Sequence, residues 1–383
     1  MIKGLELHLV QLEGEAEKVR SDVRAFLKEE LAAGSYRPAC DAWLSKADPD
    51  FSRKLGERGW LGMTWPKKYG GKERSALERY VVTEELLASG APVAAHWFAD
   101  RQSGPLLLRY GTEEQKRDIL PGIIRGETYF AIGLSEPNTG SDLASISTSA
   151  QKVEGGWLLN GSKVWTSGAH YAHYMVTLCR TAPKTGKKHD GLSQLLVDLS
   201  AEGVIVRPIR LMTGEHHFNE VILEDVFIPD HMVIGTIGAG WEQSMAELAY
   251  ERSGPERFLS TFPLFAELIR VLKKNPANEV SSITIGRLVA RLTALREMSL
   301  GVANLLEQGV TPDITAALVK DLGTQFESQI GEAARLLISF GSGVPENYKA
   351  MLATAILHSP GFTLRGGTTE ILRGIIAKGV GIR

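Results

Sequence analysis

The sequence predicts an α+β protein in which a β domain separates two helical regions. Three observations predict it: apolar residues follow helix spacing from about residue 13 to 120, their period falls to two between about 132 and 234, and helix spacing returns after Gly238-Ala239-Gly240. We expect an N-terminal α-helical domain over residues 1–128, a β domain over residues 129–236 and a C-terminal α-helical bundle over residues 237–383.

Size, composition and charge are those of an ordinary globular protein. The chain has 383 residues, of which 43% are hydrophobic and 23% are charged, and its net charge is −2. This balance predicts no nucleic-acid partner. Cys40 and Cys179 lie far apart in the sequence and fit neither a disulfide framework nor a metal site, so we expect a reducing, cytoplasmic setting and no bound metal. No apolar run has the length of a membrane span or the features of a secretion signal.

The N-terminal third is predicted to be helical. Four apolar residues recur at helix spacing in its first part: Val19, Val23, Phe26 and Leu27. Residues 80–87 repeat this spacing, and Thr112 followed by two glutamates has the pattern of a capped helix start. Glycine and proline residues between positions 59 and 66 predict a turn that interrupts the helices.

The middle third is predicted to consist of β-strands. Two short apolar runs, residues 157–159 and 162–165, flank Asn160-Gly161, and this dipeptide predicts a hairpin turn because both residues readily adopt a positive φ. Further runs rich in β-forming residues are separated by polar or glycine-containing breaks: residues 175–179, 194–199, 204–207 and 221–228. We therefore expect a compact β domain here.

Helix spacing returns in the last third. It predicts helices over residues 241–252, 258–273, 282–308, 312–339 and 367–378. The polar stretch 273–278 has the composition of an exposed break between two of them. No internal repeat or low-complexity segment is present, so the order of helices, sheet and helices is itself the main indication of the fold.

Two segments of the predicted β domain carry the residues best suited to bind a ligand. The first is a turn-rich loop with hydroxyls at Ser135 and Ser141 and backbone amides near Gly140, which suit a polar ring edge or a phosphate. In the second, Trp165 and Ser167 would share one face of a regular strand and present a flat ring and a hydroxyl to one object. Each segment alone is more often structural. Together they favour a planar heterocycle.

The order of these motifs resembles the acyl-CoA dehydrogenase family of flavoproteins over nearly the whole chain. The markers stand in the family's order: Gly59-Trp60, Trp65-Pro66, Gly70-Gly71, and residues 134–142, 161–167, 226–229 and 367–371. The resemblance implies a helical domain, a β domain and a helical bundle, with FAD between the last two. It also implies α,β-dehydrogenation of an acyl-CoA thioester, with electrons passed to electron-transferring flavoprotein.

The resemblance assigns roles to residues by their position in these motifs. Ser135 would bond the pyrimidine edge of the flavin, Trp165 would pack on the rings and Ser167 would bond near N5. Ser141 would touch the pyrophosphate or the acyl-CoA, which Tyr250 and Arg252 would also contact. The full set of implied FAD contacts is Ile132, Leu134, Ser135, Gly140, Ser141, Trp165, Thr166, Ser167, Gly367, Thr368 and Glu370.

The implied reaction needs a carboxylate that removes the α-proton of the thioester. Many family members carry this glutamate just before the Gly-Thr of the C-terminal segment, where this chain has Gly366. A minority carry it on a helix of the bundle directly before an arginine, and Glu251-Arg252 has that pattern. We therefore hypothesise that Glu251 is the base and that Gly366 leaves room for its carboxylate. The Gly366 amide would bond the thioester oxygen, and Glu247 is the competing base.

The chain departs from the family in the segments through which a neighbouring subunit completes the FAD site. The usual motifs are not recognisable in residues 253–260 and 339–343. Some bacterial relatives divide the work between two different subunits with one FAD per heterodimer. We therefore expect either a homo-oligomer, a dimer or a tetramer, or a heterotetramer with a related subunit.

Two other functions remain open on the sequence. The chain could be a flavin monooxygenase or oxidase of the same fold, or a non-catalytic subunit of a heteromeric acyl-CoA dehydrogenase. The presence of Glu251 favours dehydrogenation. Residues 215–217, Glu-His-His, have poor spacing for a metal and are interpreted as a solvated turn, and His170 and His173 are expected to pack beside the flavin segment.

Overall fold

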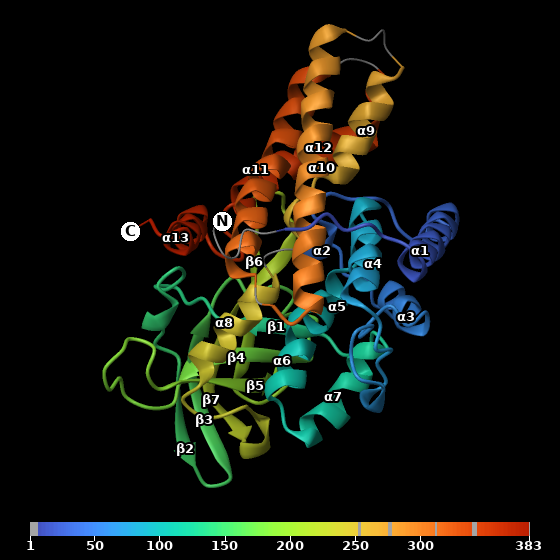
Figure 1. The fold of residues 1–383 in the computed structure, drawn as a ribbon. Helices are drawn as coiled ribbons and strands as arrows, with labels where there is room; N and C mark the ends of the chain where they lie inside the picture. The colour runs from blue at the N-terminus through green and yellow to red at the C-terminus, as the bar shows by residue number, and fades with distance from the viewer. Residues whose placement is uncertain (1–6, 252–253, 275–277, 311, 339–342, 383) are drawn as a thin grey trace. The chain divides into compact units, whose positions relative to one another are not determined.

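The computed structural model describes residues 7–251, 254–274, 278–310, 312–338 and 343–382, and for residues 247–251 it describes the backbone alone (Figure 1). The chain forms two compact units. Unit 1 comprises Met1–Lys46, Arg74–Pro92 and Glu251–Arg383, and unit 2 comprises Ala47–Glu73 and Val93–Tyr250. The N-terminal helices are therefore shared between the units. The division into three domains along the sequence stays a prediction.

Unit 2 is built around one eight-stranded sheet. Its main path runs β6-β7-β3-β2-β4-β5-β8, and β1 pairs with β4 in parallel. The strands are β1 (Phe130–Gly133), β2 (Ser149–Val153), β3 (Gly156–Lys163), β4 (Tyr174–Arg180), β5 (Leu192–Asp198), β6 (Val204–Arg210), β7 (His216–Pro229) and β8 (Val233–Ile234). The predicted change of period after residue 130 is therefore confirmed, and every predicted β run overlaps a strand.

The predicted hairpin turn at Asn160-Gly161 is wrong. These residues lie inside β3, and the hairpin turn between β2 and β3 is Glu154-Gly155. A register shift between Leu159 and Gly161 forms a bulge against β7. Glycine is required there because a Cβ on Gly161 would lie 2.4 Å from the Thr148 hydroxyl, and its φ is 149°. Gly161 therefore allows close packing of the backbone at a bulge within the sheet, and the dipeptide does not form a turn.

Helices cover one part of the unit 2 sheet. They are α3 (Pro49–Glu57), α5 (Ala94–Phe98), α6 (Gly104–Tyr110), α7 (Glu113–Ile124) and α8 (Gly240–Glu251), with short helical turns at Lys67–Tyr69, Ala99–Ser103, Leu143–Ser145 and Asp230–Met232. The capped start at Thr112 is confirmed, since its hydroxyl accepts the Gln115 amide at the start of α7. Leu107 and Ile123 pack against Phe130 in one core cluster, which joins α6 and α7 to the first strand.

Unit 1 contains the remaining helices. They are α1 (Glu15–Ala32), α2 (Ala42–Ser45), α4 (Ala76–Ala88), α9 (Phe262–Leu272), α10 (Glu279–Glu307), α11 (Asp313–Leu337), α12 (Glu346–Phe362) and α13 (Thr369–Gly379), with a helical turn at Pro255–Arg257. The predicted spacing of α1 is confirmed, because its buried residues include Val19, Val23, Phe26 and Leu27. Helix α12 was not predicted, and it continues through Pro360 near its end.

The long helices of unit 1 run side by side (Figure 1), and α11 contacts α9, α10, α12 and α13. Elsewhere in unit 1, ion pairs join α1, α4 and α10. Glu84 of α4 bonds Arg296 of α10 at 2.6 Å and Arg20 of α1 at 3.3 Å. Glu84 is mostly buried, so these bonds are needed to offset the cost of taking its charge out of water. None of the helices in the described part of the chain has the length and apolar content needed to span a membrane.

Candidate functional site

The loop that follows β1 is closed by its own backbone. Glu136 and Thr139 exchange two main-chain hydrogen bonds of 2.8 and 3.0 Å, which place Pro137-Asn138 at the corner of a tight turn. Beyond this turn the chain passes through Gly140 and Ser141, which are both exposed. Ser135 is half-buried on the other side of the turn. The predicted phosphate-binding residues Gly140 and Ser141 are therefore accessible to solvent, and the main-chain bonds of the turn hold the backbone that precedes them.

A buried ion pair fixes the base of this loop to the end of β3. Lys163 is 0% exposed, and its Nζ donates to Glu136 Oε1 at 2.9 Å and to the Leu134 carbonyl at 3.2 Å. Glu136 also accepts hydrogen bonds from the backbone amides of Ser147 and Thr148. Despite burial, the Lys163 charge and these donors lower the pKa of Glu136 to about 2. The loop and the strand end are therefore held together as one unit.

Trp165 stands directly beyond this anchor with an unusual backbone. Its φ is +58° and its side chain is 57% exposed. A left-handed conformation at a bulky residue costs free energy, and strain of this kind is retained where a site needs a particular geometry. The expectation that Trp165 and Ser167 share a strand face is wrong, because β3 ends at Lys163 and the left-handed residue breaks the two-residue period.

Backbone and side-chain bonds on both sides hold Trp165 in place. The Val164 amide donates to the Ser135 carbonyl at 2.9 Å, so the two predicted flavin segments are in direct contact. Thr166 and Asn219 exchange two main-chain hydrogen bonds, and Asn219 Nδ2 donates to the Thr166 carbonyl at 2.9 Å. Asn219 is fully buried in β7. The strained residue is thus anchored from the 135 loop and from the sheet.

Thr166 carries a polar atom that the protein leaves without a partner. Its hydroxyl is buried and makes no hydrogen bond with any described residue. A buried hydroxyl without a partner costs about 1–3 kcal/mol. It lies next to an exposed aromatic ring in a strained segment, and this combination is suited to a bound group that has both a flat face and a polar edge.

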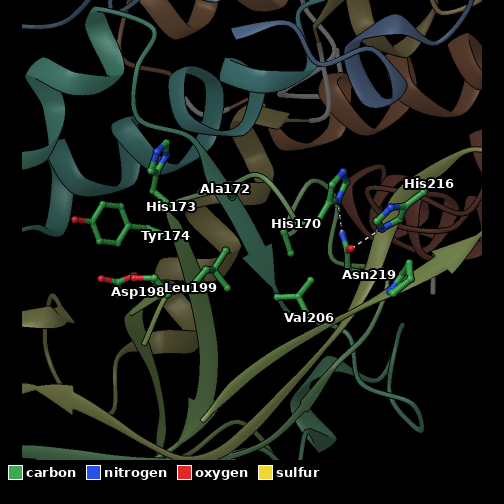
Figure 2. A pocket seen from close by; sticks show the side chains of 12 residues that line it. His170, Ala172, His173, Tyr174, Asp198, Leu199, Val206, His216 and Asn219 are labelled. Atoms are coloured by element: carbon green, nitrogen blue, oxygen red, sulfur yellow. Dashed lines mark hydrogen bonds between the residues drawn. The ribbon is translucent and has the colours of Figure 1, made fainter. Parts of the chain in front are cut away.

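A cavity of about 510 Å³ lies beside this segment in unit 2 (Figure 2). Its lining residues are Ala169, His170, Ala172, His173, Tyr174, Asp198, Leu199, Ser200, Val206, Pro208, His216 and Asn219. Figure 2 shows Asn219 between two imidazoles: His216 Nε2 donates to its Oδ1 at 2.7 Å, and its Nδ2 lies 3.2 Å from His170 Nδ1. The same amide that anchors Thr166 therefore forms part of the cavity wall.

The histidines differ from the expectation in one respect. His216 and His217 do not form a solvated turn: they begin β7, and His217 is buried. His216 stacks on His170 with ring centroids 4.0 Å apart. Burial and the neighbouring His216 lower the pKa of His170. Among the described residues, no group of three His, Cys, Asp or Glu side chains is placed to hold a metal ion.

In unit 1, the other predicted site residues form a tight turn before α13. Gly366 and Gly367 have φ of 68° and 99°, a conformation that favours glycine at both positions. Thr368 caps α13, and Glu370 stands exposed in its first turn. The fully buried Lys320 of α11 donates to the Gly367 carbonyl at 2.7 Å. The turn is therefore tied to a central helix of the bundle.

The predicted base lies at the edge of the described chain. Glu251 is the last residue of α8, so the predicted helix is confirmed up to that point. The side chains of Glu247, Tyr250 and Glu251 and the whole of Arg252 fall outside the described residues. Their roles stay predictions.

Sequence reasoning missed the residues that anchor the site. Glu136 lies inside the loop that the sequence analysis singled out. Lys163 lies at the end of an apolar strand, and a lysine in that position could have indicated a buried charge that needs a partner. Asn219 and Lys320 carried no local signal, because their partners are 53 and 47 residues away.

Family models match the chain in three consecutive parts. The N-terminal domain of acyl-CoA dehydrogenase matches residues 13–127, the middle domain matches residues 131–226 and the C-terminal domain matches residues 238–381. Among curated proteins, the acyl-CoA dehydrogenase FadE34 of Mycobacterium tuberculosis is 34% identical over 94% of this chain, which spans 50% of that relative. IpdE1 of the same organism is 32% identical over 96% of this chain and 97% of its own length.

Solved structures agree with these matches. The Tcur3481-Tcur3483 steroid ACAD has a TM-score of 0.86 at 28% identity and covers 97% of this chain and 99% of its own. An acyl-CoA dehydrogenase from Geobacillus kaustophilus also has a TM-score of 0.86, at 26% identity, with 98% and 100% coverage. Three matched domains in order, relatives above 30% identity and the same α+β fold establish the family: this chain belongs to the acyl-CoA dehydrogenases.

Proposed function

We propose that this chain is an oxidoreductase that performs FAD-dependent α,β-dehydrogenation of an acyl-CoA thioester. The observation that carries the proposal is the strained and exposed Trp165 beside the buried, unpartnered Thr166 hydroxyl. A structural role alone would favour a buried ring and a satisfied hydroxyl. Family membership supports the same conclusion.

The residues of these two segments are suited to FAD. Trp165 offers an aromatic surface for the ring system, and the Thr166 hydroxyl and Ser167 offer polar groups for its edge. The exposed residues Gly140 and Ser141 are suited to the pyrophosphate. We also assign FAD contacts to Ile132, Leu134, Ser135, Gly367, Thr368 and Glu370. Bound there, FAD would supply a hydride acceptor for the β-carbon of the substrate.

The protein's own part in the reaction is proton transfer and charge stabilisation. We assign Glu251 as the base whose carboxylate takes the α-proton, so that the Cα–H and Cβ–H bonds break and a carbon–carbon double bond forms. The Gly366 amide would donate to the thioester oxygen, where negative charge develops as the proton leaves. Ser141, Tyr250 and Arg252 would hold the substrate, which fixes the α-carbon against the base.

Assembly and electron transfer complete the proposal. We propose that electrons leave to electron-transferring flavoprotein and that a second subunit, identical or related, completes the FAD site. One similar solved structure is the Tcur3481-Tcur3483 steroid ACAD, which has two named components, and another is the ChsE4-ChsE5 complex from Mycobacterium tuberculosis. These two structures favour a heteromeric assembly for this chain, and the steroid ACAD favours a ring-bearing acyl-CoA over a straight-chain fatty acyl-CoA.

Anaerobic reduction of the flavin tests this function. The chain would be purified together with any chain that accompanies it, its FAD content measured, and a panel of straight-chain, branched and steroid-bearing acyl-CoA thioesters added without oxygen. We expect loss of the yellow flavin colour with at least one thioester. Glu251→Gln should retain FAD and lose this bleaching, whereas Glu242→Gln, in the first turn of the same helix, should bleach normally.

Each other outcome favours a named alternative. Bleaching by Glu251→Gln with its loss in Glu247→Gln would move the base to Glu247. Flavin that is reduced only by a separate reductant and then consumes oxygen would indicate a monooxygenase. No FAD and no bleaching, alone or with the accompanying chain, would indicate a non-catalytic subunit.

A further inference from the structure

A buried ionic cluster in unit 1 holds the residue that immediately precedes the Gly366 turn. Arg365 Nη1 donates to Asp41 Oδ2 at 2.7 Å, and His358 Nδ1 of α12 donates to the same oxygen at 3.0 Å. Asp41 is 1% exposed. The adjacent Arg365 charge and the hydrogen bonds from His358 and Arg365 hold the pKa of Asp41 well below its usual range despite burial. Asp41 is thus a permanent counter-ion for Arg365.

The guanidinium of Arg365 is fixed on its other sides as well. Its Nη2 donates to Ser260 Oγ at 3.1 Å, and its Cζ lies 4.6 Å from the ring centre of Trp43 and 4.9 Å from that of Phe362. These contacts with a carboxylate, a hydroxyl and two aromatic rings restrict the orientation of the planar guanidinium. The guanidinium is therefore restrained at the end of a side chain whose backbone leads directly into the Gly366 amide.

The other end of the turn has its own anchor. Lys320 is 0% exposed, and its Nζ donates to the Gly367 carbonyl at 2.7 Å. The two glycines, with φ of 68° and 99°, have no side chain through which they could be packed in place. The Thr369 amide donates to the Thr363 carbonyl across the turn at 3.2 Å, and Arg365 and Lys320 add the side-chain anchors.

Stability alone does not account for this arrangement. Buried charges cost desolvation energy, and apolar residues of similar volume often stabilise a fold equally well or better. An ionic cluster does offer one fixed geometry, because charged hydrogen bonds are short and directional. Here that geometry is imposed on the main-chain amide that, in the proposed reaction, donates to the thioester oxygen where negative charge develops.

We propose that Arg365 and Lys320 are positioning residues for the dehydrogenation: with Asp41 as the buried counter-ion, they hold the Gly366–Gly367 turn so that the Gly366 amide points at the thioester oxygen. This inference rests on the proposed function. Neither residue touches the substrate. Their effect is on the orientation of the amide, so they should change the rate of proton abstraction more than substrate binding.

Steady-state and anaerobic kinetics of three variants test it, with the protein purified together with any accompanying chain. Arg365→Lys keeps the charge but loses the planar fork, Arg365→Met loses both, and Lys320→Met removes the bond to Gly367. Arg335→Gln is the matched control, because Arg335 is exposed and pairs with Glu332 on the surface of the same unit. We expect kcat to fall by up to about 100-fold in the Met variants, less in Arg365→Lys, with KM for acyl-CoA unchanged.

The outcomes separate the inference from the function on which it rests. If the wild-type protein is not bleached by any acyl-CoA, the proposed function fails. If the wild-type protein is bleached and folded Arg365 and Lys320 variants keep its kcat, the inference is wrong. A rise in KM at constant kcat would also overturn it. If the Met variants fail to fold, Arg365→Lys provides the test. A lower kcat at unchanged KM would support the inference, and an unchanged kcat would overturn it.

Discussion

Both units hold a predicted site segment through a fully buried lysine, but they do so over different distances in the sequence. In unit 2, Lys163 bonds the Leu134 carbonyl and pairs with Glu136, so the loop that it anchors supplies its own counter-charge. In unit 1, Lys320 bonds the Gly367 carbonyl, and the neighbouring Arg365 pairs with Asp41, 324 residues earlier. The charge pair beside the predicted flavin segment therefore joins residues 27 positions apart, whereas the charge pair beside the turn before α13 joins residues 324 positions apart.

The largest expected effect comes from breaking the local anchor. Lys163→Met would leave the Glu136 carboxylate buried without its cation, which costs about 3–5 kcal/mol of stability. Thermal or denaturant unfolding measures the loss. Lys152→Met is the matched control, because Lys152 pairs with Asp230 at the surface and its loss should cost about 1 kcal/mol or less. Equal losses in the two variants would mean that the buried pair is not the anchor we describe.

The bundle should respond to pH through Glu327, which lies beside the Arg365 cluster. This fully buried carboxyl accepts the Ser260 amide at 2.8 Å, and burial raises its pKa from 4.5 to about 7. The folded state holds the Glu327 proton more tightly than the unfolded state does, so the protonated carboxyl contributes to the free energy of unfolding. This contribution is complete below pH 4.5 and is lost as the pH rises through about 7.

We therefore expect Glu327→Gln, which mimics the protonated form, to be about 3 kcal/mol more stable than the wild-type protein at about pH 8. Near the ordinary glutamate pKa of 4.5 the two should be alike. Denaturant unfolding at both pH values measures the difference. A constant difference between wild type and variant across this range would contradict a titrating Glu327.

A smaller effect is expected where the sheet holds the strained tryptophan. Asn219→Ala removes the side-chain bond to the Thr166 carbonyl, which keeps its bond from the residue 219 main-chain amide, so the cost should be about 0.5–1.5 kcal/mol. It should also weaken FAD retention, because Trp165 loses one of its anchors. Asn160→Ala, which removes an exposed pair with Asp225 in the same sheet, is the control and should keep its FAD. Full FAD retention by Asn219→Ala would show that the main-chain bonds of Thr166 hold the segment without the side-chain amide.

The smallest change in stability is expected at Thr166. Thr166→Val deletes the unpartnered hydroxyl, so the stability of the FAD-free protein should stay the same or rise slightly. FAD affinity should fall if that hydroxyl bonds the cofactor. Thr177→Val is the matched control, because the Thr177 hydroxyl is also buried and unpartnered among the described residues but lies within β4. Calorimetric titration with FAD compares them, and equal affinities would remove Thr166 from the cofactor site.

Features with a local cause were predictable from the sequence. The spacing of Val19, Val23 and Phe26 predicted the buried face of α1, and Thr112 predicted the start of α7, because both depend on residues a few positions apart. The turn at Asn160-Gly161 was mispredicted because a glycine needed for close approach has the same local pattern as a turn glycine. Helix α12 was not predicted, and it includes the exposed Pro360 near its C-terminal end.

The sequence by itself therefore determined the order of helices and sheet and the family, and it singled out the two segments that we propose for the flavin. It also placed Trp165 beside Thr166. Only the tertiary structure decided that Trp165 is strained and exposed, that Lys163 and Glu136 form a buried pair, and that Asp41 neutralises Arg365. The physical reason is range: periodicity and capping act within a few residues, whereas burial and charge pairing depend on which distant segments share a dry interior.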